Sequence, residues 1–345
     1  PAIHHKKDAA KVASKILGAL RSPYRLATIK ATSPVTIGVS IGISIIPADG
    51  KDVETVTKNA DLAMYTAKET GKNRSVFYSR DMDKKAFEKW EIEQGIKKGI
   101  QNREFRLCYQ PLVNMQEKII GFEALIRWNH PELGDLPPGR FIPIAEETGL
   151  ITPLGNWIME QACRDTAKLN KSGYSSLFVA INLSSKQFEQ KDIVDNISSI
   201  IQRTRIKPGN LKLEITETCI MNAPEEAIKK MHDIKARQPG IQIAIDDFGT
   251  GYSSLSYLSK LPADLIKIDL SFVSKLFQSN NEKIVNAIIN LALSLGMEIV
   301  AEGVESHDQF VFFKQKKCGL LQGFYFHKPL DYIDLCGILE KGVYV

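Results

Sequence analysis

The sequence predicts an α/β protein whose larger part is a TIM-type (β/α)8-like barrel, preceded by a truncated α+β segment at the N-terminus. Eight short β-rich runs alternate with helix-length segments over the last two-thirds of the chain. Polar residues follow the apolar part of several of these runs. The first eighty residues differ, because they contain two helical segments around one β-rich run. Two structural units are therefore expected.

The composition is that of a globular protein with a large core. The chain has 345 residues, of which 43% are hydrophobic and 25% charged. The formal net charge is +5, and much of the basic excess lies in the first hundred residues, away from the acidic residues described below. A solvated basic surface explains this distribution better than a nucleic-acid groove, so no nucleic-acid polymer is expected as a partner.

Cysteine content and hydropathy bear on the cellular compartment. The five cysteines are scattered and form no Cys-x-x-Cys pair, which argues against a disulfide framework and against a thiolate zinc site. No apolar stretch approaches the ~18 residues of a membrane helix. We therefore expect a cytoplasmic location without membrane contact from this chain, although a longer parent protein could be tethered to a membrane.

The N-terminal segment, residues 1–80, is expected to be a small α+β unit. Residues 8–20 have helical apolar spacing, residues 35–46 form a run rich in Val and Ile, and residues 53–70 predict a second helix that Gly71 ends. Residues 81–102 are charged and helical in pattern, and predict a linker helix into the next domain, residues 103–345. The apolar residues of this linker helix are expected to pack rather than to carry chemistry.

The eight candidate strands of the barrel share a β-rich composition and turn-like boundaries. They are FRLCYQP (105–111), IIGFEALIRW (119–128), LFVAINLS (177–184), LKLEITE (211–217), IQIAIDDFG (241–249), ADLIKID (263–269), EIVAEGVE (298–305) and LLQGFYF (320–326).

Polar side chains fall at or near the ends of these runs, where a parallel barrel places its active site. They are Glu123, Asn182, Glu214, Asp246, Asp247, Lys267, Glu302 and Glu305. Carboxylates that converge at buried strand ends raise one another's pKa and are costly unless a cation neutralises them. A bound divalent cation is the simplest way to neutralise these carboxylates.

The ligand types narrow the choice of metal and of reaction. Carboxylates plus one amide oxygen suit Mg²⁺ or Mn²⁺. Zinc would favour His or Cys ligands, and we expect none of the six histidines to occupy a strand end. Adjacent Asp246 and Asp247 could serve two ions about 4 Å apart, which suggests phosphodiester hydrolysis. Lys267 could fix or deprotonate the attacking water, or balance phosphate charge.

Each residue also has a purely structural interpretation. Asp246 and Asp247 could form an Asx-type turn that caps the next helix. Glu214 could form a structural ion pair with Lys267, and Arg127 could pair with Glu123. Two further carboxylates, Glu217 and Glu305, lie where helix caps are common. The metal-site hypothesis depends on the agreement of five or more strand ends.

Two motifs in the N-terminal segment resemble the GGDEF family of diguanylate cyclase domains. They are VTIGVSIGISIIPADG (35–50) and NADLAMYTAKETGKNR (59–74). The Gly-Gly-Asp-Glu-Phe turn that gives the family its name is absent. The resemblance therefore implies a truncated domain that makes no cyclic nucleotide, in a chain that is a fragment of a larger protein.

The second part of the chain, from about Ile92 to Leu330, resembles the EAL family of cyclic di-GMP phosphodiesterases. The signature is Glu123-Ala124-Leu125 with Arg127 and Trp128. It is followed by FIPIAEETGLI (141–151), NLSSKQF (182–188), LEITET (213–218), DDFGTGYSSLSYL (246–258), IKID (266–269), AEGVE (301–305) and QGFYF (322–326).

The EAL resemblance implies a two-metal site with Mg²⁺ or Mn²⁺. Glu123, Asn182, Glu214 and Asp246 would bind one ion, Asp246 and Asp247 would share in a second, and Glu302 would support the second through water. Lys267 matches the lysine that orients the nucleophilic water. Glu217 matches the glutamate that holds the DDFGTGYSS loop, which would link metal binding to the dimer interface.

The same resemblance implies the substrate and the assembly. The substrate would be cyclic di-GMP, the product linear pGpG, and the assembly a homodimer through the EAL domain. Four residues, Gln110, Arg127, Glu305 and Gln322, match positions near the phosphate or guanine edges of the substrate. Two positions depart from the family pattern: Gly319 replaces a frequent acidic residue, and Phe324 replaces the usual Tyr but keeps a stacking face.

Two other functions remain open on the sequence. A catalytically silent cyclic di-GMP receptor would use the same binding residues and signal through the linker. A Mg²⁺-dependent enolisation enzyme would use Lys267 as its base, since acidic strand ends and a lysine serve that chemistry as well. Adjacent Asp246 and Asp247 and the family resemblance weigh against the enolisation enzyme.

Overall fold

The computed structural model describes residues 5–24, 35–250, 255–278 and 280–341. The chain divides into two compact units, residues 1–92 and 93–345. The division falls within one helix, α3 (Arg80–Asn102), which occupies the segment predicted as a linker helix. Each unit is described separately below.

The first unit is a small α+β structure, as the sequence predicts. It contains α1 (Lys6–Leu20), β1 (Ile41–Ile43), α2 (Val53–Glu69) and β2 (Ser75–Phe77), and the two strands pair in parallel. The side chain of Asp52 accepts a hydrogen bond from the backbone N–H of Thr55 and so caps α2. The strand β1 is shorter than the predicted run 35–46.

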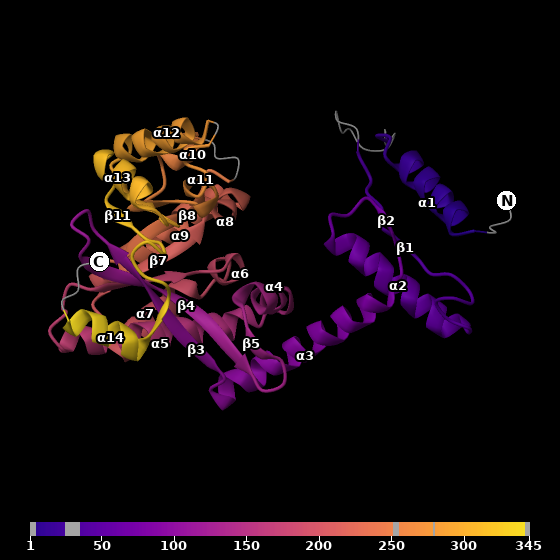
Figure 1. The fold of residues 1–345 in the computed structure, drawn as a ribbon, viewed down its shortest axis with the longest axis horizontal. Helices are drawn as coiled ribbons and strands as arrows, with labels where there is room; N and C mark the ends of the chain where they lie inside the picture. Colours follow the sequence, from indigo (N-terminus) through magenta and orange to yellow (C-terminus); the bar gives the residue numbers. More distant parts are fainter. Residues whose placement is uncertain (1–4, 25–34, 251–254, 279, 342–345) are drawn as a thin grey trace. The chain divides into compact units, whose positions relative to one another are not determined.

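The second unit is a closed barrel with helices outside it (Figure 1). Around the barrel, each strand is paired with its neighbours in the order β3, β11, β10, β9, β8, β7, β6, β4 and back to β3. The strands are β3 (Phe105–Val113), β4 (Ile119–His130), β6 (Phe178–Asn182), β7 (Leu211–Thr216), β8 (Gln242–Phe248), β9 (Leu265–Ile268), β10 (Glu298–Ala301) and β11 (Leu320–Leu321). All eight predicted strands are therefore confirmed, although β11 is only two residues long.

The expected all-parallel barrel is wrong in one strand. The strand β3 runs antiparallel to both of its neighbours in the ring, β4 and β11. Only residues 114–118 separate β3 from β4, which is too short for a helical crossover but suits a hairpin. The hairpin places Gln110 directly opposite Glu123, and the short outer strands β5 (Gly134–Leu136) and β12 (Leu330–Asp331) extend the sheet beyond it.

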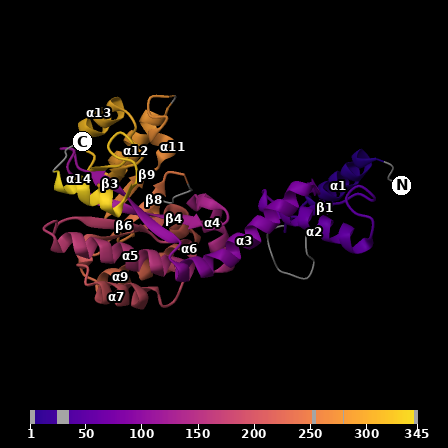
Figure 2. The same ribbon diagram turned by 60° about the horizontal axis from the view of Figure 1, so that its bottom comes forward.

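Helices cover the outside of the barrel, and α5, α7 and α9 lie side by side along one flank (Figure 2). The helices of this unit are α4 (Pro138–Thr148), α5 (Ile151–Lys171), α6 (Ser185–Phe188), α7 (Ile193–Thr204), α8 (Glu217–Asn222), α9 (Pro224–Arg237), α10 (Leu255–Leu258), α11 (Leu270–Val273), α12 (Asn281–Ser294), α13 (His307–Gln315) and α14 (Tyr332–Glu340). Among the described helices, none is both long and apolar enough to cross a lipid bilayer.

The lower part of the barrel interior is an apolar layer. Large and small side chains from six different strands form one buried cluster: Leu112, Phe178, Ala244, Leu265, Val300 and Leu320. This layer corresponds to the side-chain layers that fill barrels of this type. It supports the C-terminal strand ends, where the polar residues lie.

The apolar layer predicts a strong dependence of stability on Leu265, which is 1% exposed. We expect Leu265→Ala to lower the free energy of unfolding by about 2–5 kcal/mol, because it removes buried surface and leaves a cavity. Leu293, which is 54% exposed on α12, provides the matched control. Urea unfolding followed by circular dichroism measures both variants, and equal losses would contradict the assignment of the core.

Candidate functional site

One buried ammonium group organises the C-terminal end of the barrel. Lys267, on β9, is 1% exposed, and its Nζ lies 2.6 Å from a carboxylate oxygen of Glu302, 2.8 Å from one of Glu214 and 3.1 Å from one of Asp246. A fourth carboxylate, that of Glu123, lies 3.9 Å away. The prediction that these side chains converge is confirmed. Lys267 is shared by several strands, so a simple Glu214–Lys267 ion pair does not describe it.

Glu123 is held by neutral amides as well as by Lys267. The side chain of Asn182 donates to Oε1 of Glu123 at 2.6 Å, and that of Gln322 donates to Oε2 at 2.7 Å. Glu123 is not at the end of its strand, because β4 continues to His130. The parallel pairing of β4 with β6 stops at Ala124, however, so Glu123 lies at the end of the parallel part of the strand. Because β4 ends at His130, the expectation that no histidine occupies a strand end is wrong for that residue.

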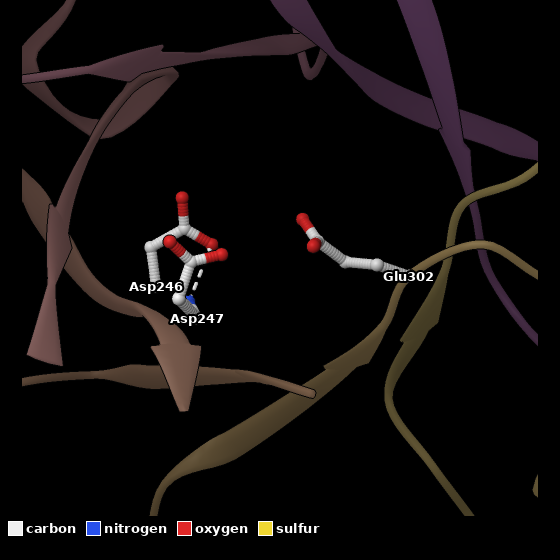
Figure 3. Close-up of side chains that lie close together, drawn as sticks. All are labelled: Asp246, Asp247 and Glu302. Atoms are coloured by element: carbon white, nitrogen blue, oxygen red, sulfur yellow. Dashed lines mark hydrogen bonds between the residues drawn. The ribbon is translucent and has the colours of Figure 1, made fainter. Parts of the chain in front are cut away.

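Three carboxylates form a second feature, a candidate cation site. One ligand oxygen each from Asp246, Asp247 and Glu302 lie within 4.8 Å of one another. Figure 3 shows that Glu302 reaches toward the two aspartates from the opposite side. Adjacent residues of a strand normally point to opposite faces. Here Asp247 has φ 53°, in the left-handed region, and the β8–β9 register shifts between Ile245 and Phe248, so the carboxylates of both aspartates lie close to that of Glu302.

The electrostatics follow from an excess of negative charge. Burial by itself would lower the pKa of Lys267, but the surrounding carboxylates outweigh burial and raise that pKa well above its ordinary value. Burial raises the pKa of Glu214 well above its usual range, and that of Glu302 to about 8, although Lys267 opposes both shifts. Burial and the charge of Asp246 also raise the pKa of Asp247. Lys267 is therefore charged, and the metal-free cluster tends to hold protons on some of its carboxyl groups.

A cavity of about 330 Å³ opens above these groups. The predicted residues that line it are Gln110, Glu123, Asp246, Lys267, Glu302, Glu305 and Gln322. It is also lined by Leu270, Gly303 and Phe324, of which Leu270 and Gly303 are not predicted from the sequence. No local pattern identifies Leu270, because an apolar residue two positions after a strand resembles the start of a core-facing helix.

Five of the predicted residues are not among the described residues that line this cavity: Asn182, Glu214 and Asp247, which belong to the clusters above, and Glu217 and Arg127. Glu217 is the first residue of α8, is 1% exposed, and accepts a hydrogen bond at 2.8 Å from the backbone N–H of Gly249. It thus holds the described start of the DDFGTGYSS segment, whereas residues 251–254 lie outside the described residues. Arg127 donates to the carbonyl of Ile126 at 2.8 Å, and no ion pair with Glu123 is found among the described residues.

The donor set fits hard divalent cations. The oxygens come from carboxylates and from the Asn182 amide, which are the ligands that Mg²⁺ and Mn²⁺ prefer. The four carboxylates that contact Lys267 also outnumber its single ammonium group. In addition, Oε1 of Gln322 is buried and without a hydrogen-bond partner in the described structure, while its amide nitrogen is engaged. These observations support a bound cation and a ligand that donates hydrogen bonds.

The chain is similar in sequence to known bacterial proteins. It is 38% identical over 325 residues to the bifunctional diguanylate cyclase/cyclic di-GMP phosphodiesterase MucR of Pseudomonas aeruginosa, covering 94% of this chain and 47% of MucR. It is 36% identical over 320 residues to the cyclic di-GMP phosphodiesterase PdeR of Escherichia coli, covering 92% of this chain and 47% of PdeR. The chain thus spans about half the length of these relatives.

The fold and the family models agree with these similarities. The solved structure "PaMucR Phosphodiesterase, c-di-GMP complex" superposes with a TM-score of 0.69 at 38% identity, over 71% of this chain and 99% of that one. Residues 2–74 match the model described as "Diguanylate cyclase, GGDEF domain", and residues 93–329 match the EAL domain. With the motifs, the barrel and the convergent strand ends in agreement, the chain belongs to the EAL domain family and carries part of a GGDEF domain before its barrel.

Proposed function

We propose that this chain is a metal-dependent phosphodiesterase that hydrolyses cyclic di-GMP to linear pGpG. The observation that carries the proposal is the cluster of carboxylates around Lys267 at the barrel mouth, with Asp246, Asp247 and Glu302 close enough to share a cation. The names of MucR and PdeR supply the substrate by analogy. Because the chain spans about half the length of MucR and PdeR, we also propose, rather than infer from these names, that the whole protein has this activity.

The metal ligands are proposed as two sets that share Asp246. Glu123, Asn182, Glu214 and Asp246 would hold one Mg²⁺ or Mn²⁺ ion. Asp246 and Asp247 would share in a second, with Glu302 supporting it through water. When bound, such ions lower the pKa of water and stabilise negative charge on phosphate oxygens.

The roles of the protein groups follow from their contacts. Lys267 is surrounded by carboxylate oxygens, three of them within 3.1 Å, so it remains an ammonium donor and orients the attacking water rather than deprotonating it. Glu302 reaches toward the two aspartates from the opposite side (Figure 3), and we assign it the role of taking the proton from that water. The water oxygen attacks phosphorus, the bond from phosphorus to O3′ breaks, and the released O3′ takes a proton from solvent.

Gln322 has a fixed orientation in this scheme. Its amide nitrogen donates to Glu123 at 2.7 Å and to Oε1 of Gln110 at 3.2 Å, so a flipped amide would place oxygen against oxygen. Its Oε1 is therefore a buried acceptor without a partner in the described structure, and we propose that it receives a donor group when the site is occupied. Gln110, Arg127 and Glu305 complete the proposed binding residues, and Glu217 positions the loop through Gly249.

The alternatives are weaker on the same geometry. An enolisation enzyme would need Lys267 as a base, but an ammonium group enclosed by carboxylates is a poor proton acceptor. A catalytically silent receptor would not need the complete ligand set around Lys267.

For the assembly and compartment, we propose a homodimer through the EAL domain and a cytoplasmic location, where a nucleotide second messenger would be found.

Loss of one ligand tests the proposed hydrolysis. We expect Glu123→Gln to lower kcat for pGpG formation by more than about 100-fold. Even residues that only hydrogen-bond to a metal ligand typically change metal affinity or activity by about 10- to 100-fold, and a ligand itself should matter more. Glu132→Gln changes an exposed residue near the end of β4 and should retain activity. Chromatography of cyclic di-GMP incubated with Mg²⁺ or Mn²⁺ measures both. Nucleotide binding without product in the unaltered chain would favour the receptor.

The raised pKa of Glu302, about 8 instead of 4.5, predicts pH-dependent stability of the metal-free protein. The folded chain keeps this proton up to about pH 8, whereas the unfolded chain releases it near pH 4.5. The stabilising contribution is therefore complete below pH 4.5 and is lost as pH rises through about 8. Thermal unfolding in a chelator should show Tm falling over this range, less steeply for Glu302→Gln. Equal slopes for both proteins, with Glu132→Gln as control, would argue against this prediction.

A further inference from the structure

The rim of the cavity contains an exposed aromatic side chain beneath a lysine. Phe324 lines the cavity and is 55% exposed. The Nζ of Lys328, which is itself exposed, lies over the ring at 5.7 Å from the centroid. This distance is within the range of a cation–π contact. The pair therefore places a positive charge next to the opening.

The backbone around this pair is fixed by hydrogen bonds. The N–H of Val304 donates to the carbonyl of Gln322 at 3.0 Å, and the N–H of Tyr325 donates to the carbonyl of Val304 at 2.9 Å. Gly323 packs so closely against Val304 that a Cβ there would lie 2.0 Å from its carbonyl oxygen. The side chain of Gln110 also donates to the carbonyl of His327 at 3.3 Å. The turn that carries Phe324 and Lys328 is thus anchored to the site itself.

The charge of the site creates a need for a cation at this rim. Beside Lys267, the site contains six carboxylates: Glu123, Glu214, Asp246, Asp247, Glu302 and Glu305. Two divalent ions would not neutralise the whole set. The substrate of the proposed function has two phosphodiester anions, of which only one can be at the metal ligands during hydrolysis. The other anion needs a cation elsewhere.

We propose that Lys328 binds the second phosphodiester of the dinucleotide at the rim of the cavity, and that Phe324 positions its ammonium group. The inference rests on the proposed function, since it assumes an anionic dinucleotide in this cavity. A lysine suits the role because it is a compact point charge that tolerates small changes in phosphate position.

The central test is Lys328→Met, which keeps an unbranched side chain and removes the charge. We expect KM for cyclic di-GMP to rise about 3- to 10-fold, with kcat within about twofold, because a rim charge acts mainly on association. The salt dependence of kcat/KM between about 0.01 M and about 0.1 M, over which the Debye length falls from about 30 Å to about 10 Å, should become weaker. Lys328→Arg should restore most of the lost affinity.

The structure offers a matched control in Lys316. Its Nζ lies 5.5 Å from the ring centroid of Phe312, so Lys316→Met removes the same charge from the same kind of contact. Phe312 is 8% exposed and is not among the described residues that line the cavity. Lys316→Met should leave KM and its salt dependence unchanged. An equal effect of both variants would mean that only net charge matters, and would overturn the inference.

Equilibrium binding separates this inference from the proposed hydrolysis. Calorimetric titration with cyclic di-GMP should show weaker binding by Lys328→Met than by the unaltered chain or by Lys316→Met. If the unaltered chain binds without hydrolysis and Lys328→Met binds more weakly, the inference stands and the phosphodiesterase proposal fails. If Lys328→Met binds and hydrolyses as the unaltered chain does, the inference fails alone. If the unaltered chain neither binds nor hydrolyses, both fail.

Discussion

The buried ammonium group of Lys267 is the interaction on which the rest of the site depends. A charge that is 1% exposed is tolerable only because Glu214, Asp246 and Glu302 contact it from three other strands or their ends. The dependence is mutual, since those carboxylates would repel one another without Lys267. Removal of one partner would leave an uncompensated buried charge, which is a larger loss than that of an exposed ion pair. The residual negative charge is what makes the site suitable for divalent cations.

Neutral amides and backbone geometry complete this arrangement. Asn182 and Gln322 each donate to one oxygen of Glu123, so the direction of that carboxylate is set without additional charge. Gln322 receives its own orientation from Gln110, which the β3–β4 hairpin places opposite Glu123. The left-handed backbone at Asp247 brings a second aspartate to the same face as Asp246. Asp247 is thus a local backbone irregularity at a functional position, where such strain is commonly found.

The residues that stabilise the barrel and the residues of the candidate site lie at different levels along the barrel axis. An apolar layer that includes Phe178, Leu265 and Leu320 fills the lower interior, and the charged groups lie at the C-terminal ends of the strands above it. The turn after β11 then connects the interior to the rim, because Gln322 contacts Glu123 while Phe324 is exposed at the opening. A substrate would therefore meet three successive environments: an exposed aromatic and cationic rim, a wall of amides, and the carboxylate cluster.

The sequence by itself determined the succession of strands and helices, the helical character of residues 81–102, and the polar side chains near strand ends, including Glu123, Glu214 and Lys267. These features are readable because apolar periodicity and strand-end polarity are properties of consecutive residues. The tertiary structure decided that β3 is antiparallel and that Lys267 contacts several carboxylates at once. It also decided that Leu270 lines the cavity and that Lys328 lies over the ring of Phe324. Those facts depend on which strands become neighbours when the barrel closes and on the backbone angles of single residues such as Asp247. Neither is encoded in a local pattern, since a period of two residues defines the face of a strand but not the partner across from it.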